Sequence, residues 1–389
     1  MTKYLLTGDD KDCYGCRACE QICPHHAISI KPNKEGFLYP VLEATKCVNC
    51  GLCVKVCPIE NVSETNTPIA VYAAQFKNEE ELLESSSGGV FSALAEYILS
   101  KNGYVAGCVF DNNLVALHIL TSDKDEVKKM RGSKYVQSDT GNIYTEIRNF
   151  LEAEKLVLFT GTPCQVDGLR RYLRKDYDNL VTVDLICHGV PSPRLLSNYL
   201  TVTTEKKGRV SSLRFRDKKR NGWCSQGSIC CNGKIKTISP YNNSYYYYYY
   251  LQNSVSRMCC YSCKYSSVER TADITIGDYW NIENIISGID TKNGFSALLI
   301  NTAKGEHILN AIYDKMYLYE TSLDEVVRGN GNLSSPSKLP LQRKAIYLRI
   351  EEEGWTAVEK TECKYNRLFP FVSKYIPKRI KKFLKKVVK

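Results

Sequence analysis

Eight cysteines near the start of the chain form two runs with the same internal spacing. The runs are Cys13-x2-Cys16-x2-Cys19-x3-Cys23 followed by Pro24, and Cys47-x2-Cys50-x2-Cys53-x3-Cys57 followed by Pro58. Thiolates at this spacing ligate 4Fe–4S clusters. Zinc is the alternative, but a zinc site takes four ligands in all, which does not explain two matching runs of four. The spacing therefore predicts two 4Fe–4S clusters.

The geometry of the runs also predicts which cysteine serves which cluster. Three cysteines spaced two residues apart wrap one face of a cubane, and the fourth lies one turn into a short helix and ligates the other cluster. The first expected ligand set is Cys13, Cys16, Cys19 and Cys57. The second expected ligand set is Cys47, Cys50, Cys53 and Cys23. Gly15 and Gly51 lie inside the loops, where glycine can adopt the positive φ that a close approach to inorganic sulfide favours.

Short strands and helices must position these groups. Between the two runs, 27–30 and 37–41 read as strands around a turn. Further on, the strand patterns 104–110, 155–159 and 180–186 alternate with helical patterns, which predicts parallel β–α units. A helix is expected within 85–101, capped by Ser86 or Ser87, and another over roughly 193–206.

Four later cysteines could form a third site. Cys164 and Cys187 follow two of the predicted strands, at the strand ends where α/β sheets bind ligands. Cys260 and Cys263 form a Cys-x2-Cys pair, which alone cannot complete a tetrahedral site. The four together could hold a third 4Fe–4S cluster, although a single cysteine in a turn is more often structural. Cys259 directly precedes Cys260 and could replace it as a ligand.

The charge of the chain is concentrated at its C-terminus. Ten of the 53 Lys and Arg residues lie in 364–389, which contains no Asp or Glu, so the remaining chain carries 43 basic against 42 acidic residues. This balance gives no support for a nucleic-acid-binding surface. Residues 374–389 read as a basic amphipathic helix suited to an anionic membrane surface, or alternatively as a helix packed on the body. We expect a cytoplasmic protein with peripheral contact at the inner face of the membrane.

Several separated motifs resemble the family of beta subunits of coenzyme F420 (deazaflavin) hydrogenases and dehydrogenases. They are SSGGVFSALAEYIL, RGSKYVQSD, VLFTGTPCQVDGLRRYL, DLICHGVPSP and DITIGDYW, spread over roughly 70–335. The N-terminal cysteine runs match the two-cluster ferredoxin domain that is commonly fused to this core. The resemblance implies an FAD site, often with an iron–sulfur cluster beside it.

The resemblance also implies which residues of this chain lie at the flavin. They are Ser87, Gly88, Gly89, Lys134, Tyr135, Thr160, Gly161 and Thr162. A cation such as Lys134 stabilises negative charge on a flavin, although without the resemblance it would read as a surface lysine. By the same resemblance Cys164, Cys187, Cys260 and Cys263 hold the core cluster. The sequence singles out no catalytic residue: His188 lies in a motif turn but reads more readily as a structural histidine.

These patterns predict an α+β chain: a small ferredoxin-like domain over 1–62, a larger α/β flavin-binding core over 69–335, and a helical extension with a basic tail over 336–389. The predicted function is that of an iron–sulfur flavoprotein oxidoreductase, which passes electrons from a ferredoxin or another redox protein to FAD and a small-molecule substrate. That substrate could be a deazaflavin or an intermediate of polysaccharide synthesis. The alternative is an electron-transfer subunit that serves a separate enzyme. The six tyrosines 245–250 are expected in a helix, where they serve packing.

Overall fold

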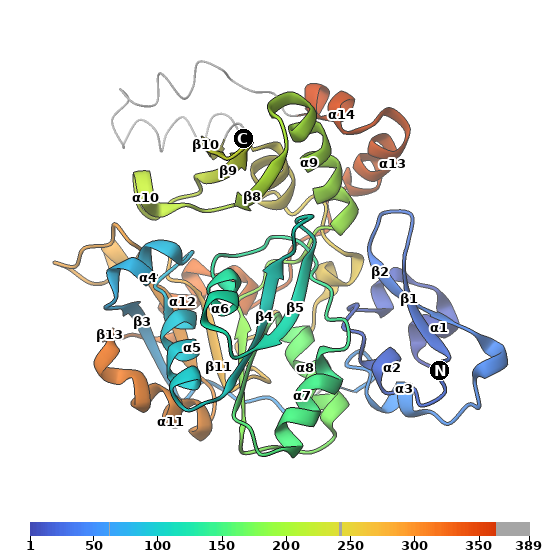
Figure 1. The fold of residues 1–389 in the computed structure, drawn as a ribbon, viewed down its shortest axis with the longest axis horizontal. Helices are drawn as coiled ribbons and strands as arrows, with labels where there is room; N and C mark the ends of the chain where they lie inside the picture. Colours follow the sequence, from blue (N-terminus) through green and yellow to red (C-terminus); the bar gives the residue numbers. More distant parts are fainter. Residues whose placement is uncertain (62, 241–242, 363–389) are drawn as a thin grey trace.

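A large mixed sheet forms the centre of the molecule in the computed structural model, which describes residues 1–61, 63–240 and 243–362 (Figure 1). Its strand order is β13-β3-β12-β11-β7-β6-β4-β5. The bounds are β3 Ala70–Phe76, β4 Tyr104–Phe110, β5 Ala116–Thr121, β6 Val157–Gly161, β7 Leu180–Leu185, β11 Ile274–Asp278, β12 Ser296–Ile300 and β13 Met316–Glu320.

The middle of this sheet is parallel and its two sides are antiparallel. Strands β4, β6, β7 and β11 pair in parallel, as the predicted β–α units require. Strand β5 joins β4 in antiparallel pairing, and β12, β3 and β13 extend the other side in the same way. The parallel core is confirmed, and the whole is a mixed α/β architecture.

Helices cover both faces of the sheet because successive strand residues point to opposite sides. Leu158 of β6 packs in a cluster with α5 (Val90–Ser100) and α11 (Ala303–Ile312). Its neighbours in sequence, Val157 and Phe159, pack in a different cluster with α7 (Ile143–Glu152) and α8 (Pro163–Leu173). The strand therefore reads as a continuous apolar run, as buried parallel strands do.

Helix α5 starts later than the serines suggested. Its N-cap is Gly89, with φ +79° and no side-chain cap, so the prediction of a cap at Ser86 or Ser87 was wrong. Ser86 instead accepts a hydrogen bond from the backbone N–H of Ser133 at 2.8 Å. The stretch before Val90 is a turn, and this hydrogen bond links it to the loop that contains Ser133.

The N-terminal region lies beside α7 and α8, and a second layer lies over one end of the sheet (Figure 1). The N-terminal region comprises α1 Lys3–Thr7, α2 Ala18–Gln21, β1 Ile28–Pro32, β2 Leu38–Leu42 and α3 Leu52–Lys55. The second layer comprises β8 Val210–Arg214, β9 Gly227–Cys231, β10 Lys234–Ile238, α9 Pro193–Lys207, α13 Arg343–Glu353 and α14 Trp355–Glu362. The β1–β2 pairing is antiparallel, which confirms the predicted hairpin between the cysteine runs.

Among the described residues, no helix is both long and apolar enough to cross a membrane. The predicted basic amphipathic helix, 374–389, lies outside the described residues.

Candidate iron–sulfur centres

The two N-terminal loops have the backbone geometry that the cysteine spacing requires. Gly15 has φ +73° and Gly51 has φ +76°, which confirms the positive φ expected at both. The N–H of Gly15 donates to Cys13 Sγ at 3.3 Å, and the N–H of Ala27 donates to Cys23 Sγ at 3.4 Å. Backbone N–H groups aimed at sulfur stabilise thiolates, which are the form that binds iron.

Four thiols of the N-terminal region interact with one another as one group, which we call the inner set. Its members are Cys13, Cys16, Cys19 and Cys57. Burial raises the pKa of the Cys19 thiol well above its ordinary value, and the charges of the other three, followed by that of Cys53, raise it further. Burial likewise raises the pKa of Cys57, to about 11. Such crowding of thiols is unfavourable for free thiolates and is relieved by a metal centre, which deprotonates its ligands.

A second group of four cysteines, the outer set, lines a hollow at the surface. Its members are Cys23, Cys47, Cys50 and Cys53, around an empty volume of about 420 Å³ that includes open solvent. Cys50 is exposed, whereas Cys16 of the inner set is buried. Within the described ranges, no three His, Cys, Asp or Glu side chains converge on the position of a single metal ion. The inner and outer sets have the members that the spacing predicts, and their role as cluster ligands stays a prediction.

A larger cavity in the core gathers the later cysteines. Cys164, Cys187, Cys259, Cys260 and Cys263 all line it, around an empty volume of about 680 Å³ that includes open solvent. Cys164 stands at the start of α8, Cys187 follows β7, and the other three lie in or next to a 3-10 helix, Met258–Ser262. Two consecutive strand ends and one distant turn therefore meet here, as strand ends in open α/β sheets do.

The thiols in this cavity also interact. Burial raises the pKa of Cys187 to about 12 and that of Cys263 to about 11, and the nearby Cys260 adds to both shifts. Cys259 is buried, and burial raises its pKa, whereas a hydrogen bond from Cys259 lowers the pKa of Cys260. The donor set of Cys164, Cys187, Cys260 and Cys263, which we call the core set, has the chemistry of a 4Fe–4S site.

Helix α8 connects the inner set to the core set. Thr162 caps the helix, and its Oγ1 lies 3.2 Å from Cys164 Sγ. One turn later is Gly168, which lies against Cys16 of the inner set. Since one helical turn rises about 5.4 Å, the two sulfur sites lie close to each other along one helix.

Several cavity residues had no signal in the sequence. Tyr14 reaches from the first cysteine loop into the cavity and packs against Tyr265, with ring centroids 5.4 Å apart. Gln137 and Arg257 line the same cavity and are 4% and 0% exposed. His188, which the sequence already showed in a motif turn, also lines it, and burial lowers its pKa. Only the positions of Tyr14 and Arg257, next to or shortly before cysteines, could have drawn attention to them.

The predicted flavin residues Ser87, Gly88 and Gly89 are used in packing. Ser87 donates a hydrogen bond to the carbonyl of Phe295 at 2.8 Å. A Cβ on Gly88 would stand 2.0 Å from the carbonyl oxygen of Ala74, so this glycine is required by the approach of strand backbones. The flavin role of these residues stays a prediction.

The other predicted flavin residues lie on two nearby segments. Lys134 donates to the carbonyls of Lys129, Met130 and Arg131 at 2.8, 2.9 and 3.0 Å, which caps the end of α6 (Lys124–Met130). Burial lowers the pKa of Lys134 to about 8. Thr160 and Gly161 end β6, and Thr160 donates to the carbonyl of Ala106 at 3.2 Å. Their assignment to a flavin also stays a prediction.

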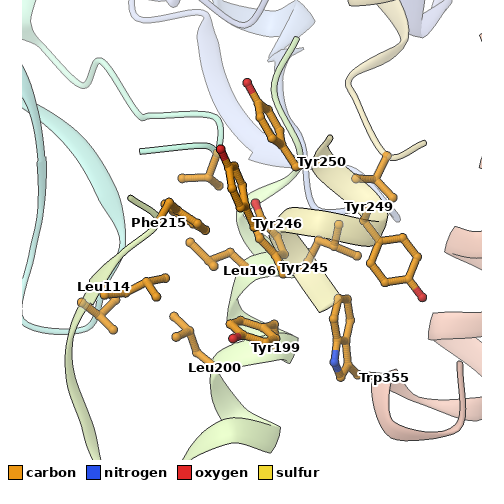
Figure 2. Packing of buried hydrophobic residues seen from close by; sticks show 14 of the residues in the cluster. Leu114, Leu196, Tyr199, Leu200, Phe215, Tyr245, Tyr246, Tyr249, Tyr250 and Trp355 are labelled. Atoms are coloured by element: carbon orange, nitrogen blue, oxygen red, sulfur yellow. The ribbon is translucent and has the colours of Figure 1, made fainter. Parts of the chain in front are cut away.

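The tyrosine run forms an aromatic core, seen in Figure 2. Residues Ser244–Tyr250 form a π-helix in which Tyr245, Tyr246, Tyr249 and Tyr250 are buried. Tyr135 stacks on this helix, with its ring centroid 4.5 Å from that of Tyr250 and 4.9 Å from that of Tyr246. The helix and the packing role are as predicted, and Tyr135 is part of the same core.

Comparisons with known proteins give one consistent result. Residues 154–326 match the model of the C terminus of the coenzyme F420 hydrogenase/dehydrogenase beta subunit, and 71–143 match the model of its N-terminal part. Residues 12–61 match a 4Fe-4S dicluster domain.

Among the relatives, one of the subunits of the F(420)H(2) dehydrogenase of Methanosarcina mazei is 21% identical over 79% of this chain and 84% of that protein. Coenzyme F420-dependent sulfite reductase of Methanocaldococcus jannaschii is 22% identical over 78% of this chain and 46% of that protein. A chain of the F420-reducing NiFe hydrogenase complex from Methanosarcina barkeri gives a TM-score of 0.46 at 16% identity, over 74% of this chain and 94% of that one.

Proposed function

Since this chain belongs to the family of coenzyme F420 hydrogenase/dehydrogenase beta subunits and carries a 4Fe-4S dicluster domain, we propose that it is an iron–sulfur oxidoreductase. In this proposal it conducts electrons from an external redox protein to FAD and a small-molecule substrate. Ferredoxin is the proposed donor, since low-potential clusters of this type exchange electrons with it.

The succession of three cysteine sets along the molecule is the observation that carries this proposal. The outer set includes the exposed Cys50, where a partner can approach. The inner set includes the buried Cys16, and the core set begins at Cys164, one turn of α8 away from the Cys16 contact. When bound, 4Fe–4S clusters at these sites carry single electrons and FAD converts them to two-electron chemistry. The order from exposed to buried suggests entry at the outer set.

The proposed flavin site lies at the turn before α5 and the loop that carries Lys134, next to the cavity of the core set. The turn before α5 and the loop that carries Lys134 are tied together by the hydrogen bond between Ser133 and Ser86. Residues 136–138, which follow Lys134 and Tyr135 directly, line the cavity that holds the core set. A flavin bound here would lie beside the last cysteine set.

A second candidate function is that of an electron-transfer subunit without its own substrate. The relative from Methanosarcina mazei is named as a subunit of a dehydrogenase, which favours this candidate. The substrate would then bind to a separate catalytic protein, and the three cysteine sets would serve the same conduction.

One experiment tests both candidates. The chain is purified without oxygen, and iron, sulfide and flavin are measured per chain. We expect about twelve iron atoms for three cubanes of four irons each, and one flavin. Turnover of a deazaflavin with an artificial electron donor by the chain alone would support the enzyme; intact clusters and flavin without turnover would support the electron-transfer role. Colourless protein that contains one or two zinc atoms would overturn the proposal.

A further inference from the structure

Arg257 lies buried between the inner and the core cysteine sets. Its side chain is 0% exposed. Nε donates to the carbonyl of Cys13 at 2.8 Å, and Nη1 donates to the carbonyl of Leu38 at 3.0 Å and to Gln137 Oε1 at 3.3 Å. The guanidinium carbon lies 3.7 Å from the centroid of the Tyr39 ring. The side chain therefore starts on the core and ends on the backbone of the first cysteine loop.

No carboxylate in the described part of the chain forms an ion pair with Arg257. The other buried arginines have one: Arg343 pairs with Glu35, Arg270 with Asp184, and Arg216 with Asp278. Nη2 of Arg257 has no hydrogen-bond partner among the described residues. Burial raises the pKa of Asp10 and the charge of Arg257 acts to lower it, but the two side chains are beyond ion-pair distance. A buried charge without a counter-charge is strongly unfavourable, so Arg257 requires a negative group of another kind.

The cysteine sets on its two sides can supply that negative charge. Arg257 lines the cavity of the core set together with Cys260 and Cys263. On its other side, Nε donates to the carbonyl of Cys13, which belongs to the inner set. Four thiolates around a 4Fe–4S cluster leave the centre with a net negative charge, which grows by one when the cluster accepts an electron.

Resting on the function proposed above, we propose that Arg257 is the shared counter-charge of the inner and core clusters and raises the reduction potential of both. A fixed cation favours the reduced state of a nearby centre over its oxidised state, because the reduced state carries one more negative charge. The effect is large in a buried site and small for the outer cluster, which lies near solvent. Arg257 is thus a positioning residue that holds the first cysteine loop and keeps two neighbouring clusters reducible.

The test is a redox titration of the anaerobically purified full chain, followed by electron paramagnetic resonance with dithionite as reductant. Arg257→Gln removes the charge, and Arg257→Lys retains it. We expect Arg257→Gln to lower the reduction equilibrium constant of two of the three clusters by at least tenfold, which is about 59 mV for a one-electron couple. The outer cluster should keep its potential, and Arg257→Lys should recover most of the loss.

A second variant covers the case in which Arg257→Gln does not retain its clusters. Gln137→Glu places a carboxylate at the oxygen that already accepts from Arg257, and so neutralises the cation with little change of shape. It should lower the same two potentials. The control is the double variant Glu35→Gln/Arg343→Met, which removes a paired buried arginine at the same contact of the N-terminal region with the body. We expect it to shift the same equilibrium constants less than twofold.

The outcomes separate the two proposals. If the wild-type chain holds no clusters, the proposed function fails. If it holds clusters and both Arg257→Gln and Gln137→Glu leave all potentials unchanged, or shift all three clusters equally, the role of Arg257 is wrong while the proposed function stands.

Discussion

Gly168 of α8 lies in direct contact with Cys16 of the first cysteine run. A Cβ on Gly168 would stand 2.9 Å from Cys16 Cβ and 3.0 Å from Cys16 Sγ. Tyr144 closes the same space, since its hydroxyl oxygen would also lie 3.0 Å from that Cβ. Any larger residue at 168 must therefore push the cysteine loop away from the helix that carries Cys164.

Gly168→Ala tests this contact. We expect it to destabilise the chain by about 1–3 kcal/mol, because extra atoms in a packed site force side chains and backbone to shift. Chemical denaturation followed by circular dichroism measures the change. Gly331→Ala is the matched control, since a Cβ there meets nothing within 4 Å. Equal stability of the two variants would show that the loop does not rest on α8.

The adjacent cysteines 259 and 260 can be separated by counting iron. Cys260→Ala should reduce the iron content from about twelve to about eight atoms per chain, because it removes a ligand of one four-iron cluster. Cys259→Ala should leave the content at about twelve. Anaerobic iron and sulfide analysis of both variants measures this. The opposite pattern would assign Cys259 as the ligand.

The buried His118 should make stability depend on pH. Burial lowers its pKa to about 4, although the carbonyl of Thr160, 3.1 Å from Nε2, partly opposes this. The unfolded chain, with a histidine pKa of about 6.5, then binds more protons than the folded chain between these two values, so stability falls as the pH falls through this window. The loss between about pH 7.5 and pH 5.5 should be about 1 kcal/mol.

Urea denaturation at both pH values measures that loss. His118→Gln is the comparison, and it should reduce the pH dependence by this amount while it keeps a polar group near Thr160. An unchanged slope in the variant would show that other groups carry the pH dependence.

The tyrosine core should depend on rings rather than on hydroxyl groups. Tyr250→Ala should cost about 3–5 kcal/mol, the cost of deleting a large buried aromatic side chain, because the Tyr250 ring packs against that of Tyr135 and is 6% exposed. Tyr250→Phe retains this ring contact and should change stability by less than about 1.5 kcal/mol. Denaturation curves of both variants give these values. A loss of electron transfer in Tyr250→Phe at normal stability would instead indicate a redox role for the hydroxyl.

Local spacing made the N-terminal region predictable. Cysteines with two or three residues between them, such as Cys13 and Cys16, are brought together by the loop itself, and Gly15 marks where the chain turns. The parallel strands were equally readable, because β6 and β7 are short apolar runs that each end in a turn with a cysteine.

Distant contacts were decided only by the tertiary structure. The sequence by itself determined the spacing within each cysteine run, the β–α units and the helical tyrosine run, since each is encoded within a few neighbouring residues. Three features depend on packing between segments more than 100 residues apart. They are the contact of Gly168 with Cys16, the contact of the Tyr135 ring with Tyr250, and the burial of Arg257 without a carboxylate partner among the described residues. No local pattern records such contacts, because burial and the absence of a counter-charge exist only after the chain has folded.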